Sequence, residues 1–114
     1  MNMPTFETAR KIARTFGNVE EATSYGTPAL KVGGKLIARL KEDNDSLVVP
    51  VDFEQRAEML ATDPATYYIT DHYLKYPYIL VRLSRIHADA LRDLLLGAWR
   101  TVGKGKARAS KRAK

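Results

Sequence analysis

Three stretches of the sequence repeat apolar residues every three or four positions, which is the spacing of one face of a helix. The first stretch follows Thr5, a suitable N-cap residue, and stops at Gly17. The second opens with Asp52 and ends before Asp63-Pro64, and the third stops at Gly103. The expected core stripes are Phe6, Ala9, Ile12, Ala13 and Phe16, then Phe53, Ala57 and Leu60, then Leu91, Leu94, Leu95, Ala98 and Val102.

Short runs between these helices alternate or are rich in β-branched and aromatic residues, and turn residues separate them. They predict strands over residues 19–25, 29–32, 35–41, 47–51, 67–70 and 78–83. Pro50 places its strand at a sheet edge or marks the end of a strand, because proline cannot donate to the ladder. Consecutive strands joined by tight turns favour an antiparallel sheet, and the helices are expected on one face of it. The pattern therefore predicts one α+β domain over residues 1–102.

Gly33-Gly34 predicts a two-residue hairpin turn, because such turns require positive φ. In the strand that follows, Leu36, Ala38 and Leu40 should face the core, with Lys35, Ile37, Arg39 and Lys41 opposite. A strict two-residue hairpin would pair Leu30 and Val32 with residues of the wrong face. Either the hairpin contains a bulge or both faces of the sheet are partly covered.

The net charge of +6 comes from the end of the chain. Of 19 basic residues, six follow Gly103, which leaves 13 against the 13 acidic residues of the chain in residues 1–102. Residues 103–114 contain no apolar side chain larger than alanine, so a disordered tail is expected there. The high pI is therefore a property of the tail and gives no support for a basic folded surface.

Several classes of function are disfavoured by composition. There is no cysteine, which excludes disulfides and thiolate chemistry and fits a cytoplasmic protein. No apolar run approaches a membrane span, and no signal peptide is recognisable. His72 and His87 are the only histidines, and neither belongs to a catalytic or metal-binding motif. Asp43-Asn44-Asp45 lacks the glycine and glutamate of a calcium loop and predicts a plain turn. We therefore expect a non-catalytic, monomeric protein without metal or cofactor.

One motif, Tyr25-Gly26-Thr27-Pro28, is followed by Lys31, Gly34, Lys35, Ile37, Ala38 and Leu40. With the strand at 78–83 and the closing Ala98-Trp99-Arg100, the chain resembles the MmcQ/YjbR-like family. The resemblance implies a CyaY-like, or frataxin-like, sandwich. It also implies a "double-wing" module in which β-hairpins contact DNA. Leu30, His87 and the basic tail depart from the family pattern.

The DNA hypothesis has two sets of candidate residues, because lysine and arginine on a β-ribbon or a tail contact phosphates. Binding through the tail would be independent of DNA sequence and sensitive to salt. A solvated hairpin face that prevents aggregation, and a tail that only aids solubility, are the alternatives. The residues are Lys31, Lys35, Arg39 and Lys41 on the hairpin, and Lys104, Lys106, Arg108, Lys111, Arg112 and Lys114 in the tail.

A second hypothesis is a small-molecule or protein-interaction site on a tyrosine-rich surface, without a role for nucleic acid. Aromatic side chains supply contact area in such sites, and a few polar groups orient the ligand. Tyrosines packed at the edge of the core would explain the same residues without a ligand. The candidate pocket residues are Tyr25, His72, Tyr73, Tyr76, Tyr78 and Arg82.

Overall fold

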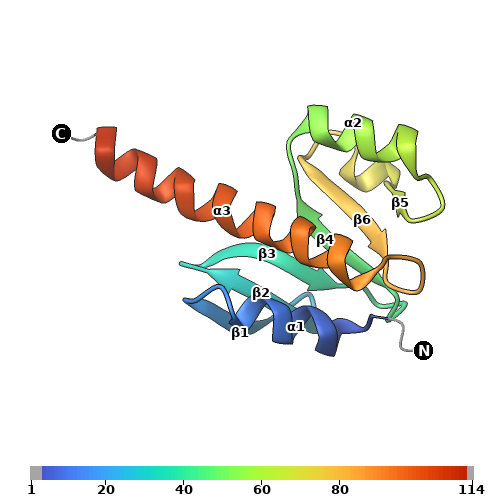
Figure 1. Ribbon diagram of the computed structural model, residues 1–114, viewed down its shortest axis with the longest axis horizontal. Helices are drawn as coiled ribbons and strands as arrows, with labels where there is room; N and C mark the ends of the chain where they lie inside the picture. The colour runs from blue at the N-terminus through green and yellow to red at the C-terminus, as the bar shows by residue number, and fades with distance from the viewer. Residues whose placement is uncertain (1–3, 113–114) are drawn as a thin grey trace.

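The computed structural model describes the backbone of residues 4–112 and the side chains of residues 4–102. A single sheet lies behind two helices, with a third helix at one end of it (Figure 1). In chain order the elements are α1 (Phe6–Arg14), β1 (Val19–Ser24), β2 (Thr27–Val32), β3 (Lys35–Leu40), β4 (Ser46–Pro50), α2 (Phe53–Thr62), β5 (Tyr67–Tyr68), the short 3₁₀ helix η1 (Asp71–Tyr73), β6 (Tyr78–Arg82) and α3 (Ala88–Arg112).

The six strands pair in the order β1-β2-β3-β4-β6-β5, and every pairing is antiparallel. Two tight turns build the β1–β2–β3 meander. Tyr25 and Gly26 join β1 to β2 with φ of 55° and 80°, and Gly33 and Gly34 join β2 to β3 with φ of 59° and 81°. Positive φ at both central residues matches the right-handed twist of paired strands. The predicted antiparallel α+β architecture is confirmed.

The main core lies between the sheet and the two helices α1 and α3, which cover one face of it (Figure 1). Ala9 and Ala13 are fully buried on α1, where small side chains let the helix approach closely. The Trp99 ring of α3 packs against Phe16, and its indole N–H donates to the carbonyl of Gly17 at 2.9 Å. This bond ties α3 to the end of α1. The stripes predicted for the first and last helices therefore meet in one core.

Strand β3 contains a bulge, which resolves the conflict in the predicted register. Leu30 pairs with Ala38 and Lys31 pairs with Leu36, so Ile37 is the additional residue. As a result Ile37 is fully buried in the main core, whereas Leu36 lies on the opposite face. The predicted positions of Leu36 and Ile37 were wrong, because one extra residue reverses the alternation of a strand.

Strand β4 lies in the middle of the sheet, so Pro50 is not on an edge strand. Pro50 is the last residue of β4 and pairs with Tyr78, which fits the alternative of a strand end. Its neighbours from Ser46 to Val49 are buried. The missing N–H of this proline therefore removes little from the hydrogen-bond ladder, because the strand ends there.

Helix α2 exposes two residues of its predicted core stripe. Phe53 is 50% exposed and Ala57 is also exposed, whereas Arg56 is buried. Met59 and Leu60 pack against the edge of the main core. Asp52 does cap the helix, accepting a hydrogen bond from the N–H of Gln55 at 2.7 Å. The helix boundaries followed from the sequence, but its buried face did not, because an arginine occupies the most buried position.

The backbone of α3 remains helical to Arg112, so the helix end predicted at Gly103 is wrong. A glycine inside a helix costs only about 1 kcal/mol relative to alanine, and Ala107, Arg108 and Ala109 favour helix beyond it. The helical backbone of residues 103–112 differs from the disordered tail predicted there, and the side chains of residues 103–114 lie outside the described residues. Over the described part of the chain, no helix has the length and apolar character required to cross a bilayer.

The turn between β3 and β4 is held by the carboxylate of Asp43. It accepts hydrogen bonds from the backbone N–H groups of Asp45 and Ser46 at 2.9 and 2.8 Å, and from the Ser46 hydroxyl at 2.8 Å. Partial desolvation is the largest single influence and raises the pKa of Asp43. These hydrogen bonds and the charge of Lys41 together outweigh it, so the pKa is lowered overall. Asp43 organises the turn as an Asn/Asp turn does.

Acidification should weaken this turn. A carboxylate with a lowered pKa stabilises the fold above its unfolded pKa of about 3.9 and loses that contribution as pH falls through the folded value. We expect Asp43→Asn to be less stable than the wild type near pH 6 and to lose less stability below about pH 4. Thermal unfolding followed between pH 6 and pH 2.5 measures both effects. Glu58→Gln on α2 is the control, and equal pH profiles for Asp43→Asn and wild type would contradict the prediction.

Candidate functional site

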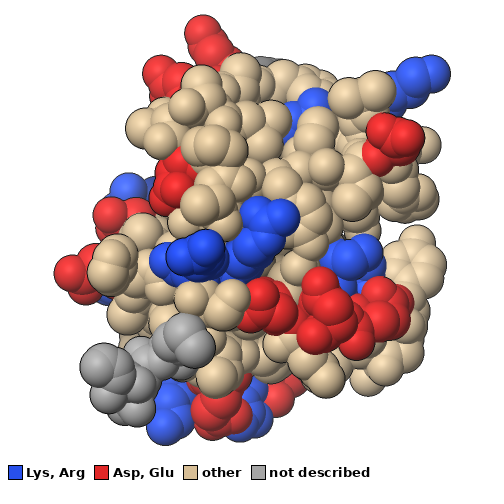
Figure 2. Space-filling view, turned by 90° about the vertical axis from the view of Figure 1, so that its right-hand side faces the viewer, with Lys and Arg blue, Asp and Glu red and all other residues tan. Residues whose placement is uncertain are grey.

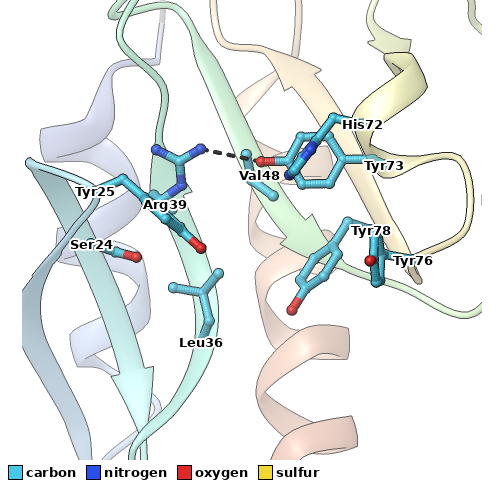
Figure 3. A pocket seen from close by; sticks show the side chains of 9 residues that line it. All are labelled: Ser24, Tyr25, Leu36, Arg39, Val48, His72, Tyr73, Tyr76 and Tyr78. Carbon is cyan, nitrogen blue, oxygen red and sulfur yellow. Dashed lines mark hydrogen bonds between the residues drawn. The ribbon is translucent and has the colours of Figure 1, made fainter.

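The face of the sheet opposite α1 and α3 carries a second, smaller cluster, in which Val48, Leu80 and Tyr73 are buried. A pocket of about 280 Å³ opens beside it. Figure 3 shows Tyr25 and Arg39 on one side of the pocket and the aromatic residues of the 72–78 segment on the other. The lining residues are Ser24, Tyr25, Leu36, Arg39, Val48, His72, Tyr73, Tyr76 and Tyr78.

Arg39 forms a buried, charged part of the pocket wall. It is only 6% exposed, and Nη2 donates to the Tyr73 hydroxyl at 3.2 Å (Figure 3). Nη1 donates to the Thr27 hydroxyl at 3.1 Å and to the Leu40 carbonyl at 3.5 Å. The guanidinium carbon also lies 5.1 Å from the centre of the Tyr25 ring, a cation–π distance. Contacts from four other residues therefore fix the direction of this side chain.

The Tyr25-Gly26-Thr27-Pro28 motif positions two of these contacts. Left-handed φ at Tyr25 and Gly26 makes the tight turn that brings the exposed Tyr25 ring over Arg39. Thr27 donates its hydroxyl proton to the Ser24 carbonyl at 2.9 Å, which leaves its oxygen free to accept from Arg39. The motif that defines the first hairpin therefore also builds one wall of the pocket.

The opposite wall is held by Arg56 of α2. Nη1 donates to the carbonyl oxygens of Tyr73, Tyr76 and Tyr78 at 2.9, 2.7 and 3.2 Å, and Nη2 donates to the carbonyl of Leu74 at 2.9 Å. None of the ion pairs found among the described side chains involves Arg56. The guanidinium therefore binds backbone carbonyl oxygens of the loop that carries the pocket tyrosines.

Aromatic contacts order the same wall. The Tyr73 ring makes edge-on contacts with His72 and Tyr78, at centroid distances of 4.7 and 5.9 Å. Tyr76 is 55% exposed and Tyr25 is 85% exposed, so both form the rim. Exposed aromatic side chains around a concavity are typical of binding surfaces. A second hollow of about 290 Å³ adjoins the pocket and shares Tyr25, Arg39, His72 and Tyr73 with it.

Five of the six residues predicted for a pocket line this one: Tyr25, His72, Tyr73, Tyr76 and Tyr78. Arg82 is absent from the lining. Its guanidinium lies 4.1 Å from the centre of the Tyr68 ring and donates to the Ala65 carbonyl at 3.2 Å, near the β5 edge of the sheet. Arg82 therefore supports the 64–68 segment instead of the pocket.

The four hairpin cations do not form one surface. Arg39 is buried in the pocket wall, Lys35 is exposed, and Lys31 and Lys41 are half-buried. Lys41 lines the adjoining hollow. On the face seen in Figure 2, basic and acidic side chains lie next to one another without a continuous basic band. On α1, Arg10 and Arg14 pair with Glu21 of β1 at 3.3 and 3.0 Å. The six tail cations lie outside the residues whose side chains are described.

Sequence reasoning missed Arg56 as a site-supporting residue and Leu36 as a pocket residue. Hydrophobic spacing gave no signal for Arg56, because that pattern selects apolar residues and an arginine occupies the most buried position of α2. No local signal located the bulge at Ile37, which depends on the pairing of β3 with β2.

The arrangement is suited to binding. Among the described residues, no group of three or more acidic or histidine side chains gathers as metal ligands. The side chains around the pocket supply flat aromatic area, several hydroxyl groups, the exposed His72 and one buried cation. Such a mixture can hold and orient a small molecule.

Comparisons with known proteins identify the family. The model of the YjbR family matches residues 14–101. Uncharacterized protein Rv2570 of Mycobacterium tuberculosis and uncharacterized protein Mb2600 of Mycobacterium bovis are each 39% identical over 106 residues, covering 77% of this chain and 82% of theirs. The crystal structure of Deinococcus radiodurans protein DR2400, a DUF419 domain, has the same fold. It aligns with a TM-score of 0.76 at 24% identity and covers 90% of this chain and 80% of that one. The chain therefore belongs to the YjbR family.

Proposed function

We propose that the protein binds a small organic molecule, without chemical turnover, in the tyrosine-lined pocket on the open face of the sheet. The observation that carries the proposal is the buried guanidinium of Arg39, held at the wall of a cavity of about 280 Å³. A buried charge is costly to keep, so one that borders a cavity is a candidate for ligand recognition.

The walls support the same function. One wall comes from the first hairpin and β3, and the other from the 72–78 loop fixed by Arg56. Both walls are therefore held by hydrogen bonds before a ligand arrives, which reduces the entropy lost on binding. The volume is near the lower end of the range for small-molecule sites, so it accommodates one or two rings.

Titration of the ¹⁵N-labelled full chain with a panel of one- and two-ring aromatic compounds tests this function. We expect some members to bind at about 1 mM or tighter and to shift the amides of residues 24–25, 36–39 and 72–78. Tyr76→Ala should weaken their binding about threefold to tenfold, by loss of aromatic contact. Leu74→Ala is the matched control, because Leu74 is 56% exposed on the same loop and does not line the pocket. Absence of shifts at these amides for every compound would refute the proposal.

DNA binding is the second candidate, and the charge of the tail favours it. Six cations without an acidic neighbour attract any polyanion, and the salt dependence of such binding has a slope of at most about −5 on logarithmic axes. The pairing of Arg10 and Arg14 with Glu21 and the burial of Arg39 weaken the case for the folded body. Duplex affinity of the full chain is compared with that of a variant whose six tail cations are glutamine. A glutamine variant that still bound duplex DNA would place the contact on the body.

A further inference from the structure

The side chains that line the pocket carry positive charge without a matching negative charge. Apart from His72, Arg39 is the one charged residue among its lining side chains, and no aspartate or glutamate lines it. The nearest carboxylate is that of Glu42, 3.7 Å from Nη1 of Arg39. The Glu42 side chain is 64% exposed and borders the adjoining hollow instead of this pocket. Water therefore screens this ion pair strongly, and it offsets little of the buried charge.

The hydrogen bonds of Arg39 leave room for another acceptor. Its three bonds within the described part of the protein go to the Thr27 and Tyr73 hydroxyls and the Leu40 carbonyl, which are all neutral oxygens. A guanidinium has five N–H groups, so two of them have no acceptor among these residues. Hydrogen bonds between a cation and an anion are about twice as strong as those between neutral groups. An anionic ligand group is therefore the acceptor that would bind the remaining N–H groups most strongly.

The remaining walls define the rest of the ligand. The Tyr25 ring lies beside Arg39, and Tyr76, Tyr78 and His72 face it from the other wall (Figure 3). Aromatic side chains pack well against flat rings in offset or edge-on geometry. The hydroxyls of Ser24 and the tyrosines can bond to either donors or acceptors and so add little preference for charge.

We propose that the pocket selects small planar aromatic anions, with the carboxylate or phosphate bound by Arg39 and the ring held between the tyrosines. This inference rests on the proposed small-molecule function and names its ligand class. It also gives Arg39 a role as a binding residue, distinct from the phosphate contact expected of it on a DNA-binding hairpin.

Three probes of nearly equal shape test the selection: 2-naphthoate, neutral 2-naphthamide and cationic 2-naphthamidine. Affinities are measured on the full chain at constant ionic strength by calorimetry and by amide shifts. We expect 2-naphthoate to bind about tenfold to a hundredfold tighter than 2-naphthamide, from the added charged hydrogen bonds, and 2-naphthamidine to bind weakest. A parallel titration with 2-naphthyl phosphate shows whether a carboxylate or a phosphate ester fits the site better.

Arg39→Gln should reduce the preference for 2-naphthoate over 2-naphthamide to less than about twofold, because the cation is removed. Arg85→Gln makes the same change at an exposed arginine outside the pocket and should keep the preference. The three-probe comparison on the wild type requires no substitution and stands if Arg39→Gln does not fold. Equal affinity for 2-naphthoate and 2-naphthamide overturns the charge selection alone, whereas failure of all naphthyl probes to shift the pocket amides overturns the pocket function as well.

Discussion

Arg56→Met should lower the free energy of unfolding by about 3 kcal/mol. The substitution keeps the length of the side chain but removes every N–H that binds the carbonyl oxygens of Tyr73, Leu74, Tyr76 and Tyr78. A buried acceptor that loses its partner costs about 1–3 kcal/mol, and water can reach part of this loop, so the total is smaller than the sum over the carbonyls. The Phe53 ring, 4.8 Å from the guanidinium carbon, also loses a cation–π contact.

Urea unfolding followed by the fluorescence of Trp99, the only tryptophan, measures this loss. Arg85→Met provides the control, since Arg85 is exposed. Arg56→Lys should fall between wild type and Arg56→Met, because an ammonium keeps the charge but cannot match the planar fork of donors. A loss below about 1 kcal/mol for Arg56→Met would contradict the prediction. It would mean that aromatic packing alone, without the Arg56 hydrogen bonds, holds the shape of the 72–78 loop.

Leu95→Ala should cost about 3–4 kcal/mol. Leu95 is fully buried in the main core, where α3 crosses the sheet, so truncation leaves a cavity that the surrounding residues fill only in part. The loss combines the transfer of the removed atoms to water with the cost of that cavity. We expect a lower urea midpoint with an unchanged slope, since the surface exposed on unfolding remains similar.

Leu96→Ala is the matched control for this truncation. It makes the same chemical change one residue later on the same helix, at a half-buried side chain outside the main core. We expect a loss of about 1 kcal/mol or less. Similar losses at both positions would show that the helix face assigned to the core by its leucine spacing is wrong.

The helix stripes of α1 and α3 could be predicted because their burial follows a fixed period of 3.6 residues. Leu91, Leu95 and Ala98 repeat at that spacing, and each is buried. The buried face of α2 could not be found this way, because its most buried residue is an arginine. Only the positions of the loop carbonyls, far away in sequence, explain why a guanidinium is stable there.

The candidate site was predicted only in part, because one of its walls depends on contacts between segments that are far apart in the sequence. Tyrosines crowded between residues 73 and 78 marked one wall of the pocket by composition alone. Arg39 was predicted on the face of the hairpin away from the main core, as a DNA contact or as part of a solvated face. The face is correct, because period-2 alternation places Arg39 opposite the core, but the side chain is buried in the pocket wall. The sequence could not show that the 72–78 loop covers this second face and makes it a pocket.

The bulge at Ile37 has a consequence for comparing members of this family. Within β3 the pocket residues Leu36 and Arg39 are three positions apart, whereas a regular strand would present residues two apart on one face. Removing Ile37 would leave Leu36 and Arg39 two positions apart, so a regular strand would present both on the pocket side of the sheet. Alignments of relatives must therefore place gaps in this strand by its pairing partner, since an offset of one position aligns Arg39 of the pocket wall with Ala38 or Leu40 of the main core.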